Sequence, residues 1–462
     1  MSADTCDLLI LGSGIAGQTA ATAAAEAGLD VVLAEKSATL GGSTVMSGGW
    51  FAFSGTDEQA QLGIDDSAEL FLRDLQEVGQ HLNDEALLRA YLDRQDRTYH
   101  WLKDHGVRFR EVEISSGQSV RRGHNTAITD VMDELHRRFV DAGGRTLVQH
   151  RAVRLRQGRS GRVVGAELRS PEGIRAIDAR LGVVIATGGF SRSTDLLRIF
   201  APEQQAALPF GGAQNTGDGL RMAWKLGADM ADMAHVSGTY GSHPDTGVVH
   251  ELLTAYYMGA IIVNRTGRRF VDESLSYKTL GRAVLKEDDG LGIQIFDADV
   301  RAMSHRGIPL KDIDTLEEKG HVLKADTLEE LAEIAGVDGE GLVATVARYN
   351  AAIADGLPDD VGRESLCNGA GELRPIVRAP FYAYPAKSLM TTTYCGLKVS
   401  PDAEVIDVEG SAIPGLYAIG EVVGGFHGAA YMTGTSLGKG AVFGLLVADQ
   451  AVARADRDGV AA

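Results

Sequence analysis

The chain opens on a strand, a glycine-rich turn, an alanine-rich helix and a second strand, in the stretch CDLLILGSGIAGQTAATAAAEAGLDVVLAEKS that begins at Cys6. Gly12, Gly14 and Gly17 give the spacing G-x-G-x-x-G between strand and helix. In a βαβ unit such glycines allow a tight turn, a close approach of the backbone to a pyrophosphate, and close packing of the helix. Glu35 ends the second strand, where a carboxylate can accept hydrogen bonds from both hydroxyls of an adenosine ribose. The opening therefore predicts a Rossmann-like α/β domain that binds a dinucleotide.

Bulk composition excludes several classes of partner. The chain has 462 residues, of which 44 % are hydrophobic, so it can bury a large core in two or more domains. Its formal net charge of −18 argues against nucleic acid and anionic membrane surfaces as partners. The first strand begins by about Asp7, and no apolar run approaches the ~20 residues of a membrane span. We therefore expect neither a signal peptide nor a membrane span.

The cysteines and acidic residues do not form a recognisable metal or hydrolase site. Cys6, Cys367 and Cys395 lie far apart and lack C-x-x-C spacing, which indicates neither a disulfide framework nor a zinc site. No cluster of His, Asp or Glu has metal-ligand spacing, and no G-x-S-x-G elbow joins a strand to a helix. We expect a protein of the reducing cytoplasm without a bound metal ion.

Periodicity places helices and strands between the opening and residue 229. Apolar residues at helical spacing predict helices over 66–78, 83–105 and 129–142, with Ser67 and Asn83 as N-caps of the first two. Alternating residues predict strands over 146–156, 161–169 and 174–179, followed by a separate buried strand in LGVVIATGGF. This order of helices and strands is typical of an α/β domain with a β-meander.

The pattern changes near residue 230 and changes back near residue 374. Between these points, short strands such as GAIIVNRTGRRFVDES, with a turn at 264–267, alternate with amphipathic helices such as DTLEELAEIAGV. After APFYAYPA, the strand GLYAIGE and a helix beginning at Leu437 resume the nucleotide-binding pattern. We therefore expect a discontinuous Rossmann-like, dinucleotide-binding α/β domain over 1–229 and 374–462, with an inserted α+β capping domain over 230–373.

Glycine-rich segments after the opening occur in a characteristic order: EKSATLGGSTVMSGG, ATGGF, NTGDGLRMA and GLYAIGEV. Together with the opening motif, this set resembles the FAD-binding fumarate reductase and succinate dehydrogenase flavoprotein superfamily over the whole chain, in particular its soluble single-chain members, among them the 3-ketosteroid dehydrogenases. The resemblance implies FAD as the cofactor. Members with covalent FAD carry a histidine after Gly42, where Ser43 and Thr44 stand here, so we expect the FAD to be non-covalent.

The resemblance also implies which residues bind FAD. Val153 would meet the adenine, while Asn215, Asp218 and Glu421 would lie around the ribitol and pyrophosphate. The start of the late helix, which attracts negative charge, would face the pyrimidine edge of the flavin. The full expected set is Gly12, Ser13, Gly14, Ile15, Ala16, Gly17, Glu35, Lys36, Gly42, Ser43, Thr44, Ser47, Gly48, Gly49, Val153, Ala186, Thr187, Gly188, Asn215, Asp218, Gly420, Glu421, Ser436 and Leu437.

Two tyrosines replace two arginines of the fumarate reductases. In those enzymes the segments that match NRTGRRFVDESLSYKTLGR and HGAAYMTGTSLG carry one arginine that donates a proton and another that holds a carboxylate; these positions are Tyr277 and Tyr431 here. A histidine of the reductases is also missing, since TTTYCG stands in its segment. Burying an unpaired carboxylate costs several kcal/mol. The substitutions therefore predict an uncharged carbonyl substrate, with Tyr256, Tyr257 and Tyr394 available to line an apolar slot.

Roles for the two tyrosines follow from the resemblance to 3-ketosteroid dehydrogenases. There, a tyrosine matching Tyr277 acts in α-proton removal, and one matching Tyr431, with a backbone N–H matching Gly434, polarises the ketone oxygen. Thr433, two residues after Tyr431, resembles the 4,5-desaturating branch, in which the tyrosine at the Tyr431 position itself abstracts the proton. The division of labour between the two tyrosines stays open.

These features favour an FAD-dependent α,β-dehydrogenase of a cyclic ketone, with a 3-ketosteroid as the leading substrate. The α carbon would lose a proton and the β carbon a hydride to flavin N5. Three alternatives remain: a desaturase of a smaller ring such as 4-oxocyclohexanecarboxylate, a fumarate-reductase-like ene-reductase acting in reverse, and an electron-carrying flavoprotein subunit. The external electron acceptor is not specified by these residues.

Overall fold

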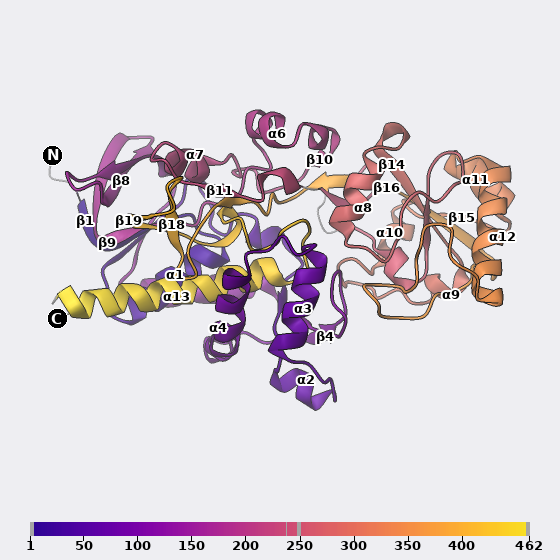
Figure 1. Ribbon diagram of the computed structural model, residues 1–462, viewed down its shortest axis with the longest axis horizontal. Helices are drawn as coiled ribbons and strands as arrows, with labels where there is room; N and C mark the ends of the chain where they lie inside the picture. Colours follow the sequence, from indigo (N-terminus) through magenta and orange to yellow (C-terminus); the bar gives the residue numbers. More distant parts are fainter. Residues whose placement is uncertain (1–3, 237, 247–250, 459–462) are drawn as a thin grey trace.

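The computed structural model describes residues 4–236, 238–246 and 251–458. Two sheets lie toward opposite ends of its long axis (Figure 1), one around β1 (Asp4–Leu11) and the other around β16 (Phe381–Met390). The larger has eight strands and the smaller six within the described residues. Each sheet has helices packed beside it, so the chain is a mixed α/β protein.

The larger sheet carries the opening βαβ unit at its centre. Its main order is β18 (Glu404–Ile406), β19 (Ala412–Ala418), β9 (Gly173–Ile185), β1, β2 (Val31–Ala34) and β6 (Arg145–Leu147). β1 pairs in parallel with β2 and β9, and β9 pairs in parallel with β19. The carboxyl ends of these strands therefore meet at one edge, which is where ligands bind in open α/β sheets.

Two of the strand predictions in this region are wrong. The predicted strand 146–156 is divided into β6, which pairs with β2, and a second strand that begins at Arg151. The predicted strand 174–179 is continuous with the buried strand that follows it. β7 (Arg151–Gln157) and β8 (Val163–Ser170) pair antiparallel, and β8 pairs with the first half of β9. β9 then continues without a break into the buried segment that pairs with β1. The sequence predicted two strands here because the first half alternates in polarity while the second half, which is covered on both faces, is continuously apolar.

Two glycine- and alanine-rich helices cover the sheet and pack on each other: α1 (Ile15–Glu26) and α13 (Thr435–Asp458). A Cβ on Gly444 would stand 2.7 Å from the backbone oxygen of Ala16, so the close crossing requires a glycine. α13 begins at Thr435, two residues before the predicted start at Leu437.

The helices α3 (Ala68–Val78), α4 (Glu85–Asp104) and α5 (Ile128–Asp141) agree with the three predicted from periodicity. The Ser67 hydroxyl accepts the N–H of Leu70, which confirms this N-cap. The predicted cap at Asn83 is wrong, because the Asp84 carboxylate accepts the N–H groups of Ala86 and Leu87. The Asn83 amide instead donates to the carbonyl of Phe426 and holds the late loop.

The smaller sheet is built around β16, which pairs with strands from across the middle of the chain. Its other strands are β10 (Leu208–Pro209), β12 (Thr239–Ser242), β13 (Ile261–Val263), β14 (Leu291–Phe296) and β15 (Leu323–Ala325). The sequence placed the return to the nucleotide-binding domain at residue 374, whereas β16 lies in this sheet. We propose that the inserted unit extends to the end of β16.

The predicted turn at 264–267 is confirmed by a hydrogen bond from Gly267 N–H to the Asn264 carbonyl. The other described elements are α2 (Asp57–Gln61), α6 (Thr194–Phe200), α7 (Asp218–Trp224), α8 (Tyr277–Val284), α9 (Ala298–Arg301), α10 (Ile313–Glu318), α11 (Leu328–Ala335), α12 (Gly339–Asp355), β3 (Trp50–Ala52), β4 (Glu111–Glu113), β5 (Gly123–Asn125), β11 (Met230–Ala231), β17 (Gly396–Leu397) and the 3₁₀ helices η1 (Thr44–Met46), η2 (Pro202–Ala206), η3 (Met233–His235), η4 (Ala255–Met258), η5 (Asp288–Gly290) and η6 (Gly420–Val422).

Candidate active site

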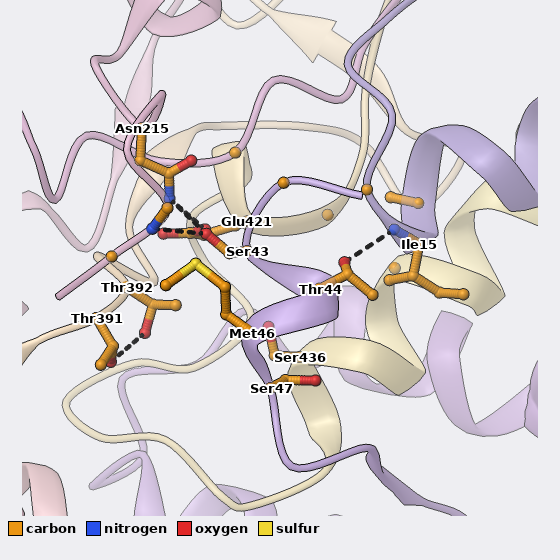
Figure 2. A pocket seen from close by; sticks show the side chains of 18 of the residues that line it. Ile15, Ser43, Thr44, Met46, Ser47, Asn215, Thr391, Thr392, Glu421 and Ser436 are labelled. Atoms are coloured by element: carbon orange, nitrogen blue, oxygen red, sulfur yellow. Dashed lines mark hydrogen bonds between the residues drawn. The ribbon is translucent and has the colours of Figure 1, made fainter. Parts of the chain in front are cut away.

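A large pocket runs from the carboxyl edge of the larger sheet to residues at the ends of strands of the smaller one. Figure 2 shows part of its wall from close by. Its nucleotide end is formed by the turn before α1 and the end of β2, and its other end by residues of α8, of the loop after β16 and of the loop before α13. The lining residues that the sequence singled out for the cofactor are Gly12, Ser13, Gly14, Ile15, Ala16, Glu35, Lys36, Gly42, Ser43, Thr44, Ser47, Gly48, Ala186, Thr187, Gly188, Asn215, Asp218, Gly420, Glu421, Ser436 and Leu437.

Two glycines at the turn before α1 and in its first turn have no room for a side chain. Gly12 has φ of +107°, and a Cβ there would stand 2.3 Å from the carbonyl oxygen of Ala186. A Cβ on Gly17 would stand 1.9 Å from the oxygen of Gly12. Gly12 therefore leaves its backbone open to the pocket, while Gly17, which does not line the pocket, lets α1 pack against the turn.

Glu35 is fixed at the end of β2 by protein donors. One carboxylate oxygen accepts the Ser13 hydroxyl at 2.7 Å and the Ser13 N–H at 3.1 Å, and the other accepts the Ser37 N–H at 2.8 Å. A carboxylate has about four acceptor positions, so Glu35 retains capacity for a ligand hydroxyl. Its position suits the ribose of a dinucleotide.

The charges at the nucleotide end are paired. The Lys36 ammonium donates to Asp218 at 2.8 Å and to the Thr216 hydroxyl at 2.7 Å, and Arg151 also donates to Asp218. Burial alone would raise the pKa of Asp218, but the hydrogen bonds from Arg151 and Lys36 lower its pKa overall. Asp218 is therefore an anion that holds two cations beside the cofactor path.

A polar network joins distant segments in the middle of the pocket. The Asn215 amide donates to Ser43 Oγ at 3.2 Å (Figure 2) and to Glu421 Oε2 at 3.1 Å. Glu421 also accepts the Thr393 N–H at 3.0 Å. Burial raises the pKa of Glu421, against the hydrogen bonds from Thr393 and Asn215. The Ile15 N–H donates to Thr44 Oγ1. These contacts hold Glu421, in the loop after β19, and Thr44 beside the opening βαβ unit.

Tyr277 and Tyr431 meet at the other end of the pocket. Tyr277 is the first residue of α8 and Tyr431 lies in the loop before α13, with ring centroids 6.1 Å apart. The hydroxyl of Tyr277 lies 3.0 Å from that of Thr433, and the hydroxyl of Tyr431 accepts the Gly434 N–H at 2.9 Å. Both tyrosines line the pocket and are less than 9 % exposed. The structure thus brings the predicted pair together.

The two phenols differ in acidity. Burial raises the pKa of Tyr431 to about 12, and the backbone N–H groups of Gly434 and Ser436 oppose this rise. Burial and the neighbouring Tyr431 raise the pKa of Tyr277 well above its ordinary value, against the hydroxyl of Thr433. Two N–H donors at the start of α13 therefore make Tyr431 the phenol that more readily carries negative charge.

A third tyrosine supports Tyr431. The ring of Tyr394 is stacked on that of Tyr431, with centroids 4.4 Å apart and an interplanar angle of 11°. Tyr394 has φ of +55°, a left-handed conformation that is strained for a bulky residue. The Lys278 ammonium lies 4.7 Å from the centroid of the same ring. Burial lowers the pKa of Lys278 to about 7, with Glu421 acting in the opposite direction.

Some predicted residues lie off the pocket wall. Val153 does not line the pocket, whereas Ala152 and His150 do. Gly49 has φ of +71°, and a Cβ there would stand 2.2 Å from the Thr126 oxygen, so it serves a close backbone crossing. Gly434 does not line the pocket either, and its N–H is bonded to the Tyr431 hydroxyl. Tyr256 and Tyr257 do not line the pocket either; they pack in the core beside Tyr277.

The sequence did not identify a further set of apolar and hydroxyl residues as lining the pocket. Met46, Thr391 and Thr392 lie in segments noted above for their glycines or for a missing histidine. The others come from loops and strand ends that no motif marks, so only the folded chain brings them together. The whole set is Met46, Trp50, Phe210, Thr239, Leu252, Pro309, Leu310, Thr391 and Thr392.

Two further observations concern metal ions and membranes. Within residues 4–236, 238–246 and 251–458, no group of three or more His, Cys, Asp or Glu residues is arranged to hold a metal ion. None of the helices in the same residues is long and apolar enough to cross a membrane.

Comparisons with known proteins agree with this site. A family model described as FAD binding domain matches residues 7–437. A fumarate reductase (cytochrome) of Shewanella frigidimarina is 30 % identical over 97 % of this chain and 77 % of its own length. A 4-oxocyclohexanecarboxylate 2-dehydrogenase of Sinomonas cyclohexanicum is 29 % identical over 97 % of this chain and 93 % of its own.

A solved structure of a 3-ketosteroid dehydrogenase has a similar fold over nearly the whole chain. The 3-ketosteroid-Δ4-(5α)-dehydrogenase of Rhodococcus jostii RHA1, in complex with 4-androstene-3,17-dione, superposes with a TM-score of 0.80 at 26 % identity, covering 97 % of both chains. FAD suits the geometry of this pocket. The features that suit it are the glycine turn, the fixed Glu35 and the network around Asn215 and Glu421. The chain therefore belongs to the FAD binding domain family, within the fumarate reductase and succinate dehydrogenase flavoprotein superfamily that its sequence resembles, and is an FAD-dependent oxidoreductase.

Proposed function

We propose that this flavoprotein desaturates a cyclic ketone between the α and β carbons, with a 3-ketosteroid as the leading substrate and non-covalently bound FAD. The observation that carries this proposal is the uncharged, phenol-lined end of the pocket. Tyr277 and Tyr431 face each other there, and the basic residues on the described pocket wall, Lys36 and His150, both lie at the nucleotide end. An uncharged carbonyl fits such a site, whereas a dicarboxylate would lose its hydration without gaining a cation.

The different surroundings of the two phenols support a division of labour. Tyr431, whose oxygen accepts N–H groups at the start of α13, takes the proton from the α carbon as a general base. Tyr277, whose hydroxyl is paired with Thr433, donates to the ketone oxygen and stabilises the enolate-like charge that develops there. These roles are the reverse of those that the resemblance to 3-ketosteroid dehydrogenases implies, in which Tyr277 removes the proton and Tyr431 and the Gly434 N–H polarise the ketone. We exchange them because the Gly434 N–H is bonded to the Tyr431 hydroxyl.

The two hydrogens leave as a proton and a hydride, and a C=C bond forms between the α and β carbons. FAD, when bound, supplies the acceptor for the hydride at N5. The chain's own task is to position the ring and exclude water, and the nearly full burial of Tyr277, Tyr431 and Thr433 serves that end. The external electron acceptor is a separate partner that must reoxidise the flavin.

Two relatives support a ketone over a dicarboxylate. The Rhodococcus neighbour acts on a 3-ketosteroid and the Sinomonas relative on 4-oxocyclohexanecarboxylate, according to their names. Fumarate reductases are also relatives, but the two positions at which the resemblance implies arginines in those enzymes are tyrosines here. We further propose a cytoplasmic location, which suits three buried cysteines without a disulfide.

The test is anaerobic mixing of the yellow protein with saturated cyclic ketones, among them a 3-ketosteroid and a substituted cyclohexanone, while the flavin absorbance is recorded. We expect a saturated cyclic ketone to bleach the flavin and the matching enone to appear in equal amount. Succinate should leave the colour unchanged. Bleaching by succinate, with no response to any ketone, would overturn the proposal.

A further inference from the structure

Three threonine hydroxyls form a short row on the pocket wall. Thr239 begins β12, and Thr391 and Thr392 directly follow β16, so the row lies where two neighbouring strands of the smaller sheet reach the pocket. The hydroxyl oxygens of Thr239 and Thr391 are 3.3 Å apart, and those of Thr391 and Thr392 are 3.5 Å apart. Figure 2 shows Thr391 and Thr392 directed toward each other at this edge.

The row has unused hydrogen-bonding capacity. Each threonine hydroxyl can donate one hydrogen bond and accept two. The two contacts within the row are long for O–H···O bonds, whose usual length is near 2.7–2.8 Å. The row therefore offers both donors and acceptors to a ligand in the pocket. The rest of the pocket wall includes apolar side chains, among them Phe210, Leu252 and Leu310, and the carboxyl group of Glu421.

The side chains of the pocket wall indicate that the row binds an uncharged group of a ligand. Hydroxyls are neutral, and Lys36, the pocket-lining lysine in the described chain, is bonded to Asp218 at the nucleotide end. A carboxylate placed against the row would lose water and gain only neutral donors. A carbonyl or hydroxyl oxygen loses less hydration and can use the same donors.

We propose that the row of Thr239, Thr391 and Thr392 is a second recognition site for the substrate. The row binds a neutral oxygen, a ketone or a hydroxyl, other than the carbonyl oxygen next to which the C=C bond forms. This inference rests on the proposed function and narrows it, because the substrate class becomes a cyclic ketone with a second, uncharged oxygen function. The phenols then fix the reacting carbonyl and the row fixes the far oxygen, so the ring is held at two points.

The experiment measures binding and bleaching separately for matched pairs of saturated ketones. In each pair one compound carries a second neutral oxygen and the other has a methylene or methyl group in its place: 4-hydroxycyclohexanone against 4-methylcyclohexanone, and 5α-androstane-3,17-dione against 5α-androstan-3-one. Dissociation constants come from the shift of the flavin absorbance or from calorimetry under air-free conditions. 4-Oxocyclohexanecarboxylate serves as the anionic probe.

We expect the dioxygenated member of at least one pair to bind about tenfold more tightly, the effect of one good hydrogen bond to a buried partner. Thr391→Val keeps the shape of the side chain and should reduce this preference to about twofold or less, and Thr239→Val is a second variant should the first fail to fold. Thr98→Val is the matched control, because it removes a buried hydroxyl bonded to the Arg94 carbonyl in α4, outside the pocket. It should keep the full preference.

Equal affinities within every pair, or a preference that survives Thr391→Val and Thr239→Val, would overturn the second site and leave the dehydrogenase proposal intact. Tighter binding of 4-oxocyclohexanecarboxylate than of both neutral dioxygenated ketones would overturn the uncharged character of the site. If no ketone bleaches the flavin, the proposed function fails, while the binding preference still decides whether the row recognises a neutral oxygen.

Discussion

The two ends of the pocket differ in the charge of their side chains. At the nucleotide end, Lys36, Arg151 and Asp218 form ion pairs, and Arg151 is about half exposed. At the other end Tyr277 and Tyr431 are almost fully buried and their partners are a hydroxyl and a backbone N–H. The comparison teaches that paired charges lie at the nucleotide end, whereas neutral phenols line the end where we propose that a ketone reacts.

Two buried lysines off the pocket wall also have lowered pKa values. Burial lowers the pKa of Lys278 to about 7 and that of Lys439 to about 8. Neither residue lines the pocket. Both amines therefore tend toward the neutral form in the alkaline range in which a phenol begins to ionise.

The largest expected effect is at the nucleotide end. Gly12→Ala would place a Cβ 2.3 Å from the Ala186 oxygen at a φ of +107°, so we expect the purified protein to lose its flavin. The ratio of absorbance at about 450 nm to that at 280 nm measures this. Gly28→Ala is the control, because it has a similar φ of +91° but no atom within 4 Å of the new Cβ. It should stay yellow and be destabilised by only about 1 kcal/mol.

The next largest effect is at the phenols. Tyr431→Phe and Tyr277→Phe should each retain FAD and slow bleaching by a saturated ketone about 100-fold or more, the usual scale for a general base or an oxyanion donor. Tyr349→Phe is the control, since its buried hydroxyl has no hydrogen-bond partner in the described structure and lies on α12. Wild-type rates in both active-site variants would refute the roles of the phenols.

The pH dependence sharpens the assignment of the base. Tyr431 must lose its proton to act, and its pKa is raised to about 12, so the reactive phenolate fraction grows about tenfold per pH unit below that value. We expect the bleaching rate to rise with pH across about pH 6 to 9 in the wild type and to lose this dependence in Tyr431→Phe. A slope that persists in Tyr431→Phe but disappears in Tyr277→Phe would exchange the two roles.

The smallest expected effect concerns the stack behind Tyr431. Tyr394→Leu removes a parallel aromatic contact at 4.4 Å, which is worth about 0.5–1.5 kcal/mol, and should slow bleaching by about three- to tenfold. Tyr394→Phe keeps the ring and should stay within about twofold of the wild type. Equal losses in both variants would show that the hydroxyl of Tyr394, and not its ring, matters.

The sequence predicted best those features that depend on local spacing. Gly12, Gly14 and Glu35 lie within one βαβ unit, whose geometry their spacing determines, and Tyr277 and Tyr431 occupy positions that the superfamily pattern defines. The N–H of Gly434 is bonded to the Tyr431 hydroxyl, and its direction depends on where α13 begins, which a glycine-rich stretch does not reveal.

The features that escaped prediction depend on contacts between distant segments. Thr239 and Thr391 are about 150 residues apart and meet only because β12 pairs with β16. Leu252 and Leu310 come from two loops joined by a bridge between Leu253 and Leu310. β16 itself looked like a strand of the nucleotide-binding domain, and its place in the smaller sheet follows from pairing with β14. Such pairings leave no local signal in the sequence.

The most direct measurement of the pocket's preference is the reoxidation of pre-reduced, dithionite-free protein under anaerobic conditions. A cyclic enone and fumarate, at equal concentration, are mixed with the bleached protein in a stopped-flow instrument, and the return of the flavin absorbance is timed. We expect the enone to restore the colour at least about 100-fold faster than fumarate, because the reacting end has phenols in place of cations. Fast reoxidation by fumarate, with no response to the enone, would contradict the assignment of an uncharged carbonyl substrate.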